Sequence, residues 1–302
     1  MPRIVLLSIP ILLAGCMAAA PELAPPTLGP AMPPPASAGA EARTLYALDR
    51  IEAVNPLTRA VLAVEPTALD EARALDANGG PRGPVFGMPI LIKDNIETRG
   101  ALPTTAGSLA LTDNVTGRDA PLVARLREAG AVILGKTNLS EWANIRSSDS
   151  ISGWSAIGGQ TRNPHALDRN GCGSSTGSGA AVAAGMAPAA IGTETDGSIT
   201  CPAAVNGIVG FKPTVGLVSR TYVVPISHSQ DTPGPMTRNV RDAALVLTAM
   251  AGTDPADPAT READARRSDY AATLSDKALA GKRIGVMRFA TGFGTNTAFG
   301  RR

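Results

Sequence analysis

Two serine clusters set among glycines are the part of this sequence best suited to chemistry. They lie in residues 171–199, GCGSSTGSGAAVAAGMAPAAIGTETDGSI, and their key members, Ser174 and Ser198, are 24 residues apart. Glycine lets the backbone turn its N–H groups toward an oxyanion, and an uncrowded serine hydroxyl can attack a carbonyl carbon. A flexible linker is also rich in glycine and serine, but the apolar runs 180–184 and 187–191 need a core to cover them. The segment therefore predicts part of an active site within a folded domain.

A lysine at the end of an apolar run is the candidate base. Residues 89–92 read PILI, which is typical of a buried strand, and Lys93 follows them. Burial penalises the charged form of an amine and lowers its pKa toward the working pH, so that a neutral lysine can accept a proton. An ordinary surface lysine is the alternative, and Lys93 taken alone does not exclude it.

Two other motif matches point to different chemistry. Residues 130–137 fit the phosphate-loop pattern GxxxxGK[ST], but the intervening AVIL is typical of a strand rather than of an open loop, so we do not expect nucleotide binding. Residues 173–177 fit the GxSxG pattern of a nucleophile elbow, with Ser175 as nucleophile, His228 as base and Asp196 as the acid. Turn-like residues precede this motif where an elbow requires a strand. A Ser/Asp/His hydrolase therefore stays as the alternative.

The composition argues against two classes of function. The chain has 302 residues, of which 44% are hydrophobic, and this indicates a globular protein of one large domain or two small ones. A formal net charge of +2 and 3% aromatic residues do not suit a nucleic-acid-binding surface. The two histidines are far apart and no HxxH or CxxC spacing occurs, which argues against a metallohydrolase. We expect no cofactor, no metal ion and no nucleic-acid partner.

The N-terminus predicts export. Arg3 precedes the apolar run 4–13, and the sequence LAGC then ends at Cys16. The run is shorter than the roughly 20 residues that span a bilayer, and the whole stretch resembles a bacterial lipoprotein signal. Residues 1–15 would then be removed and Cys16 lipidated, whereas an ordinary cleaved signal is the alternative. The expected location is the periplasm or the cell envelope, with membrane contact through the lipid anchor only.

A proline-rich tether is expected between this signal and the folded domain. It covers residues 16–39 and includes PELAPPTLGPAMPPP, which favours an extended, semi-rigid chain. Export would also place Cys172 and Cys201 in an oxidising compartment, where a disulfide is possible. We favour the simpler interpretation that both are free, buried cysteines.

Helical and strand patterns alternate along the rest of the chain. Apolar residues at helical spacing precede an expected stop at Asn55-Pro56. Helices are expected over residues 45–54, 68–77, 121–129, 179–186 and 238–251. Strands are expected over residues 60–64, 89–92, 131–134, 208–211, 223–226 and 283–287. This alternation favours an α/β fold in which helices cover a central sheet.

Three separated segments join the lysine and the serines in one resemblance. They are GMPILIKDN at 87–95, GSSTGS at 173–178 and GTETDGSI at 192–199, and together they resemble the marker segments of the amidase signature family. The order of the segments and the separation of the two serines match that family, and GFKPT at 210–214 follows where its GxKPT segment belongs. The resemblance covers residues 45–283 and implies a mixed central sheet with helices on both faces.

Within this family, the sequence particularly resembles the bacterial peptide amidases. The similarity lies in GKTNLSEWAN at 135–144, SISGWS at 150–155 and PISHSQDT at 225–232. It implies hydrolysis of peptide C-terminal amides, with small amides as alternative substrates. A role in a transfer-RNA amidotransferase is disfavoured, because the export signal would separate the enzyme from that substrate.

The resemblance also implies a role for each candidate residue. Ser198 would be the nucleophile that forms an acyl-enzyme, Ser174 a bridging serine in a cis peptide, and Lys93 the terminal base. Ser175 would have a supporting role. Four backbone N–H groups would hold the oxyanion, those of Thr195, Asp196, Gly197 and Ser198.

The C-terminal end differs from the pattern of this family. Its members continue beyond the strand expected at 283–287, whereas this sequence ends as FATGFGTNTAFGRR. We therefore expect the amidase signature domain, residues 40–302, to be incomplete at its C-terminus. The alternative to an active amidase is an inactive remnant or a lipid-anchored binding protein, and the oligomeric state stays open.

Overall fold

A computed structural model describes residues 34–35, 37–78 and 82–285. The signal peptide 1–15, the lipidation site Cys16 and residues 16–33 of the tether lie outside these ranges. Within them, no helix combines the length and the apolar character that crossing a membrane requires.

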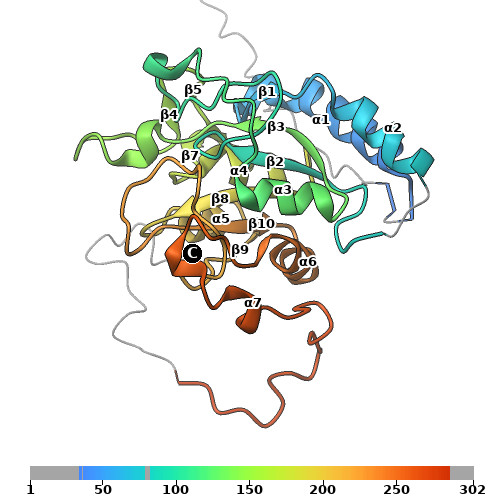
Figure 1. Ribbon diagram of the computed structural model, residues 1–302. Helices are drawn as coiled ribbons and strands as arrows, with labels where there is room; N and C mark the ends of the chain where they lie inside the picture. The colour runs from blue at the N-terminus through green and yellow to red at the C-terminus, as the bar shows by residue number, and fades with distance from the viewer. Residues whose placement is uncertain (1–33, 36, 79–81, 286–302) are drawn as a thin grey trace, which may run out of the picture.

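A six-stranded mixed sheet forms the centre of the structure (Figure 1). Its strands, in spatial order, are β1 (Val61–Val64), β3 (Val132–Thr137), β2 (Pro89–Lys93), β8 (Ala189–Glu194), β10 (Thr232–Thr237) and β9 (Val209–Gly210). β2 is parallel to β3 and β8, whereas β1 and β10 are antiparallel to their neighbours. The carboxyl ends of β2, β3 and β8 therefore meet at one edge of the sheet.

Helices cover both faces of this sheet. The first face carries α1 (Ala40–Thr58), α2 (Ala68–Asn78) and α4 (Thr176–Ala183), and the second carries α3 (Pro121–Glu128) and α6 (Val240–Met250). In Figure 1, α1 and α2 lie at the upper right, beside β1 and β3, and α6 lies at the lower right, beside β10. In β2, Leu91 belongs to the first core, and Ile90 and Ile92 belong to the second, as expected for a strand buried on both faces. The predicted mixed α/β fold is confirmed.

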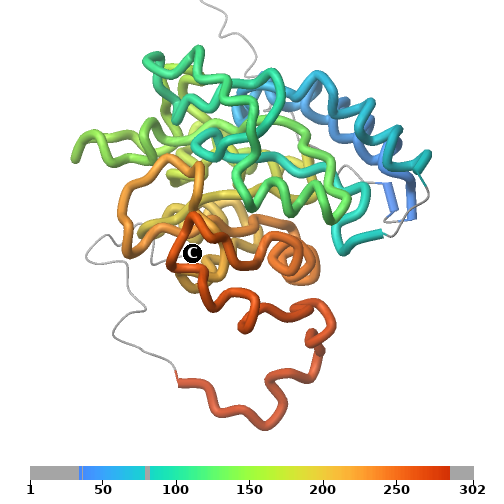
Figure 2. Tube along the Cα trace, in the orientation of Figure 1, coloured from blue at the N-terminus to red at the C-terminus, as the bar shows by residue number. Residues whose placement is uncertain are grey.

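The remaining elements are short. They are the strands β4 (Trp154–Ser155), β5 (Gly159–Gln160), β6 (Arg162–Asn163) and β7 (Ala166–Asn170), the helices α5 (Thr200–Val205) and α7 (Ala263–Arg266), and the 3₁₀ turns η1 (Leu109–Leu111), η2 (Glu141–Asn144) and η3 (Pro258–Thr260). After α7, Figure 2 follows an extended segment that runs away from the sheet, and its residues are mostly exposed.

The predicted end of the first helix is wrong. α1 continues through Pro56 to Thr58, and Arg59 ends it in the left-handed region with φ +53°. Pro56 lies in the last turn of the helix, three residues before Arg59, and the Asn55 side chain pairs with the backbone of Val61 through two contacts of 2.8 Å. That pairing joins the end of the helix to the start of β1.

Two predicted strands are also wrong. Residues 223–226 form a single bridge between Val223 and Ile96 rather than a strand. Residues 283–285 carry no regular structure, and the rest of the strand expected at 283–287 lies outside the described ranges. Both segments are apolar enough to suggest a strand, but neither has a partner along its length within the described part of the chain.

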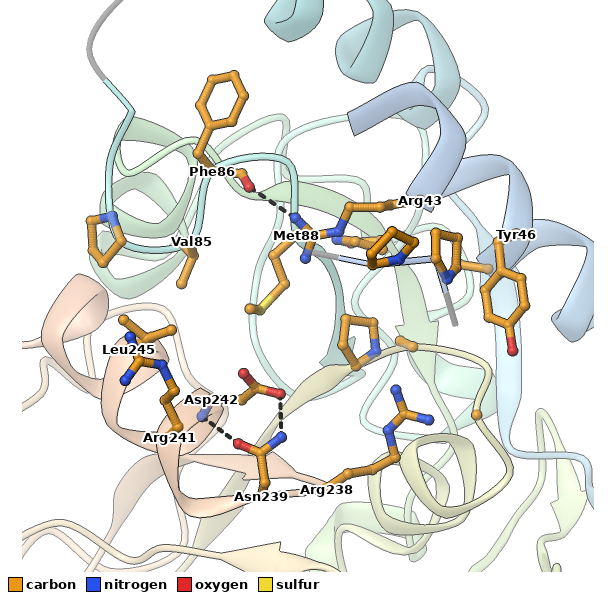
Figure 3. Close-up of a pocket in the computed structure, with 18 of the residues that line it drawn as sticks. Arg43, Tyr46, Val85, Phe86, Met88, Arg238, Asn239, Arg241, Asp242 and Leu245 are labelled. Carbon is orange, nitrogen blue, oxygen red and sulfur yellow. Dashed lines mark hydrogen bonds between the residues drawn. The ribbon is translucent and has the colours of Figure 1, made fainter. Parts of the chain in front are cut away.

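A pocket opens at the amino ends of β2 and β8, the edge of the sheet opposite to Lys93 (Figure 3). Pro89 begins β2 and Pro188 precedes β8, and both line this pocket. Its volume is about 620 Å³. The sequence contains no motif that marks it.

Candidate active site

The candidate residues gather at the carboxyl edge of the parallel strands. Lys93 is the last residue of β2, and Glu194 is the last residue of β8. The turn that contains Ser198 follows β8 directly, and Ser174 lies just before α4. Loops at this edge are the usual place for a binding site in an open α/β sheet.

Lys93 is fully buried, as the sequence predicts for a base. Its Nζ donates to Ser174 Oγ at 2.7 Å and to Thr193 Oγ1 at 2.8 Å. Burial lowers the pKa of Lys93 to about 7, although the carboxylates of Asp231 and Glu194 oppose this shift. At neutral pH, therefore, about half of the Lys93 amines carry a lone pair that can accept a proton.

Ser174 is held beside this amine by its backbone. The peptide bond between Gly173 and Ser174 is cis, as the resemblance implies. Ser140 N donates to Ser174 O at 3.0 Å, and the serine is fully buried. A Cβ at Gly173 would lie 2.5 Å from Ser140 Oγ and 2.8 Å from Thr176 Oγ1, so only glycine fits there. Ser174 is thus fixed in contact with Lys93.

Ser198 lies at the accessible side of the site. It is 8% exposed, and its carbonyl accepts a hydrogen bond from Ser175 N at 3.1 Å. Within the described residues its hydroxyl forms no hydrogen bond, including none to Ser174. Gly197 has φ +76° and nothing within 4 Å of the position of a Cβ, which leaves the backbone before Ser198 open. The structure therefore connects Lys93 to Ser174 directly, and connects Ser198 to this pair through the backbone of Ser175.

The four backbone N–H groups expected for the oxyanion divide into two sets. Gly197 N donates to Glu194 Oε1 at 2.9 Å. The N–H groups of Thr195, Asp196 and Ser198 make no hydrogen bond to other described residues. These three donors are available to an oxyanion, whereas the Gly197 N–H is engaged in this conformation.

Sequence reasoning did not identify Glu194. It is 5% exposed, and its Oε2 accepts from Ile199 N at 2.7 Å and from Thr200 N at 2.8 Å. It thereby satisfies N–H groups at the start of α5 and fixes the turn that contains Ser198. No sequence signal marks this role, because capping side chains ordinarily lie directly before a helix, whereas Glu194 lies six positions before the first residue of α5.

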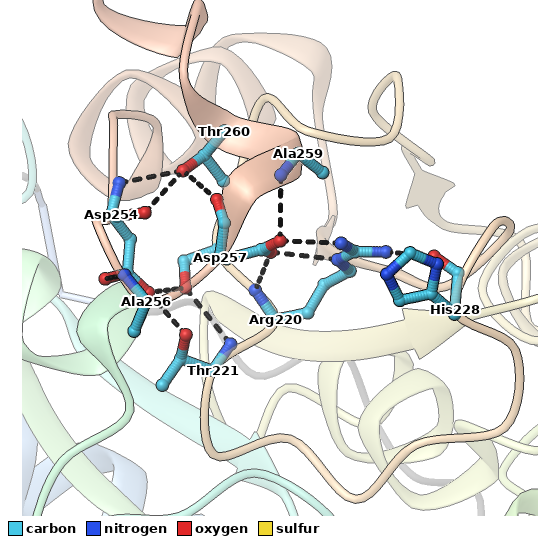
Figure 4. A network of polar contacts seen from close by, with 9 residues as sticks. Arg220, Thr221, His228, Asp254, Ala256, Asp257, Ala259 and Thr260 are labelled. Carbon is cyan, nitrogen blue, oxygen red and sulfur yellow. Dashed lines mark hydrogen bonds and ion pairs between the residues drawn. The ribbon is translucent and has the colours of Figure 1, made fainter.

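Ser175 does not meet the partners that an elbow needs. It is fully buried, and its Oγ donates to Thr193 O at 3.1 Å and accepts from Thr193 N at 3.2 Å. The His228 carbonyl accepts from Arg220, which in turn holds Asp257 (Figure 4). Among the described residues, no hydrogen bond connects Ser175 with His228 or Asp196. The Ser/Asp/His arrangement is not assembled.

Cys172 and Cys201 form a disulfide, so the interpretation of free cysteines is wrong. Their Cα atoms are 5.9 Å apart, although 29 positions separate them along the chain. Folding brings the first turn of α5 beside the turn that precedes α4, which spacing alone does not reveal. The bond joins the segment of Ser174 to the segment of Ser198.

A second buried lysine explains the phosphate-loop match. Lys136 lies in β3 and donates to Ile96 O at 2.7 Å and to Thr104 Oγ1 at 2.8 Å. It also pairs with Asp94 at 3.1 Å. This lysine is a structural cation within the sheet. In the part of the chain that the structure describes, no group of three or more His, Cys, Asp or Glu side chains could hold a metal ion.

Comparisons with known proteins match most of the chain. The profile of the protein family described as Amidase matches residues 42–301. A probable amidase of Arabidopsis thaliana is 47% identical over 247 residues, which cover 80% of this chain and 48% of the relative. A glutamyl-tRNA(Gln) amidotransferase component of Acidothermus cellulolyticus is 48% identical over 259 residues, or 84% of this chain and 50% of the relative.

Solved structures agree with these matches. The X-ray structure of native peptide amidase from Stenotrophomonas maltophilia has a TM-score of 0.79 and 58% sequence identity, and the match covers 82% of this chain and 52% of that one. An amidase family protein from Bacillus anthracis has a TM-score of 0.76 and 41% identity, over 79% of this chain and 48% of that one. The chain thus spans about half the length of the relatives and structures it matches.

Proposed function

The chain belongs to the amidase family, and from this premise we propose that it hydrolyses carboxamide C–N bonds with Ser198 as nucleophile, Ser174 as proton relay and Lys93 as base. The resemblance to amidases that the marker segments indicate is confirmed by the family match. The contact between Lys93 Nζ and Ser174 Oγ, 2.7 Å long and fully buried, is the observation that carries the proposal.

The proposed reaction moves one proton along this relay. Neutral Lys93 accepts the proton of the Ser174 hydroxyl, which takes the proton of Ser198 as its oxygen attacks the amide carbonyl. The negative charge on the carbonyl oxygen is held by the free backbone N–H groups of Thr195, Asp196 and Ser198. The relay then returns the proton to the departing nitrogen, and ammonia leaves. Water attacks the acyl-enzyme through the same relay and releases the carboxylate.

We propose a peptide C-terminal amide as the substrate. The support is the 58% identity to the structure of a peptide amidase. A small aliphatic or aryl amide is the second candidate, because the same relay acts on any carboxamide that reaches Ser198. Neither substrate requires a cofactor in this mechanism.

We also propose that the protein is exported and anchored through Cys16. The lipoprotein-type start of the sequence supports this location. Radiolabelled palmitate should enter the wild-type protein in a bacterial host, and Cys16→Ser should abolish the labelling. Equal labelling of both proteins would refute the anchor.

Two measurements on the full chain test the catalytic proposal. Ammonia release from a peptide amide reports turnover, and labelling by a fluorophosphonate with mass mapping reports the nucleophile. We expect Ser198→Ala to abolish both signals and Lys93→Met to abolish turnover, whereas His228→Ala should retain both. Circular dichroism confirms that each variant is folded.

Two results would contradict the proposal in different ways. A label on Ser175, or loss of activity only in His228→Ala, would favour the nucleophile elbow. A wild-type protein that unfolds cooperatively, but neither accepts the label nor releases ammonia, would favour the inactive or binding protein.

A further inference from the structure

The pocket at the amino ends of β2 and β8 is rich in arginine. Four arginines line it, and Asp242 is the single carboxylate among its described lining residues. Arg82 lies over the ring of Phe86, with its guanidinium carbon 4.9 Å from the ring centroid. The arginine pocket, as we call it, is therefore strongly cationic. The arginines are Arg43, Arg82, Arg238 and Arg241.

Two of these arginines face each other across the pocket. Figure 3 shows Arg43 reaching in from α1 and Arg238 just after the end of β10, with Asp242 to one side, beside Asn239. Arg43 is partly buried and donates to Phe86 O at 3.1 Å, whereas Arg238 is exposed, and neither arginine forms an ion pair within the described residues. Burial lowers the pKa of Arg43, while Asp242 opposes this shift. The guanidinium groups thus lack the anions that such groups ordinarily bind.

Apolar side chains form one side of the pocket. They are Val85, Met88 and Leu245, of which Val85 and Met88 are almost fully buried, so that Leu245 offers the accessible apolar surface. A ligand that suits this lining combines a compact anionic group with a short organic body. Phosphate suits facing guanidinium groups better than a carboxylate does, because it offers more oxygens and up to two negative charges.

We propose that the arginine pocket binds a phosphate ester whose organic part contacts Leu245. The pocket and the catalytic residues lie at opposite ends of the same strands, since β2 runs from Pro89 in the pocket to Lys93 in the active site. A strand of five residues separates them by about 13 Å. The binding site is therefore distinct from the amidase site.

The chain itself indicates one source of such an ester. Pro34 and Pro35 belong to the predicted tether, and both line the pocket. These two residues therefore place one described part of the tether beside the pocket, and Cys16, the predicted lipidation site, lies on the same tether. The headgroup of an anionic phospholipid is then one source of the phosphate, and a soluble phosphate ester is the other.

Two probes separate these sources. The full chain is prepared with Cys16→Ser, so that no lipid is attached, and is titrated calorimetrically with sn-glycerol 3-phosphate. The same protein is sedimented with vesicles of phosphatidylglycerol and phosphatidylcholine, and with vesicles of phosphatidylcholine alone. Binding of glycerol phosphate identifies the soluble source. Binding only to the phosphatidylglycerol vesicles identifies the headgroup.

Matched variants test the pocket. We expect Arg238→Gln to weaken binding about tenfold or more, because it removes a charged donor from the phosphate. The control Arg162→Gln removes the same charge at an exposed residue of β6, outside the pocket, and should change binding less than about twofold. Arg43→Gln/Arg238→Gln should abolish binding, and if this variant does not fold, Arg238→Gln alone decides.

Two outcomes would overturn the proposal. One is that neither probe binds the protein. The other is that Arg238→Gln and Arg162→Gln weaken binding equally, as a diffuse charge effect would. Amide hydrolysis should be unchanged in Arg238→Gln, so a negative result here is distinct from a failure of the amidase proposal.

Discussion

The pH dependence of catalysis follows from the burial of Lys93. An exposed lysine with a pKa of 10.5 is neutral in about one molecule in 3,000 at pH 7, whereas a pKa of about 7 makes it neutral in about half. Burial thus increases the fraction of available base more than a thousandfold. Because only the neutral amine accepts a proton, kcat/KM should rise tenfold per pH unit below pH 6 and level off above pH 8. At pH 5 it should be about 100-fold below the plateau.

Removing a nearby carboxylate tests independently whether local electrostatics set the pKa of Lys93. The carboxylate of Asp231 raises the pKa of Lys93, so Asp231→Asn should move the acid limb of the profile toward lower pH. Asp231 also accepts from Ile226 N at 2.8 Å and from Ser227 N at 2.9 Å, and asparagine can keep one such acceptor. Asp276→Asn, at an exposed residue of the C-terminal segment, is the control that removes an equal charge.

The assay is ammonia release from a peptide amide between pH 5 and pH 9, at substrate concentrations below KM. Circular dichroism at each pH separates loss of folding from loss of base. A flat profile across this range would refute the assignment of Lys93 as the base. So would an acid limb that shifts equally in Asp231→Asn and Asp276→Asn, because the shift would then not report the local field at Lys93.

Three further predictions concern Lys93, the disulfide and Gly173. In urea unfolding, the free energy of unfolding of the wild type relative to Lys93→Met should rise between pH 7 and pH 9 by up to about 1.4 kcal/mol per unit, because over this range the unfolded chain keeps a proton on Lys93 that the folded chain loses. Replacing Cys172 and Cys201 with serine opens a loop of 29 positions and should lower the free energy of unfolding by about 3.6 kcal/mol, measured by the same method. Gly173→Ala places a Cβ 2.5 Å from the Ser140 hydroxyl and should lower kcat about 100-fold with little change in KM, as steady-state kinetics would show.

The fold was predictable where apolar patterning is strong. The run PILI before Lys93 is buried on both faces, and such a run is typical of a central parallel strand. β10 was missed because its sequence, TPGPMT, is typical of a turn. In an antiparallel strand, the backbone hydrogen bonds of successive residues point alternately to the two flanking strands. Pro233 and Pro235 therefore need not interrupt the pairing of β10 with β8. Only the tertiary context distinguishes this strand from a loop.

The candidate residues of the site were predictable, and the contacts that support them were less so. Motif and spacing identified Lys93, Ser174 and Ser198, and the structure places the first two in contact. The disulfide depends on a contact between segments distant in sequence, which the separation of two cysteines does not reveal. The engagement of the Gly197 N–H likewise depends on the direction in which the Glu194 side chain turns.

The supporting groups also determine how basic Lys93 is. Complete burial alone would lower its pKa further, but the carboxylates of Glu194 and Asp231 act in the opposite direction and hold the pKa at about 7. Glu194 is at the same time bound to three backbone N–H groups around the turn of Ser198, and Asp231 accepts from the Thr195 hydroxyl in that turn. The two carboxylates that set the basicity of Lys93 are therefore the same groups that fix the turn of Ser198. A movement of this turn that displaced either carboxylate would change the protonation of Lys93, so the position of Ser198 and the charge of Lys93 are coupled electrostatically as well as through hydrogen bonds.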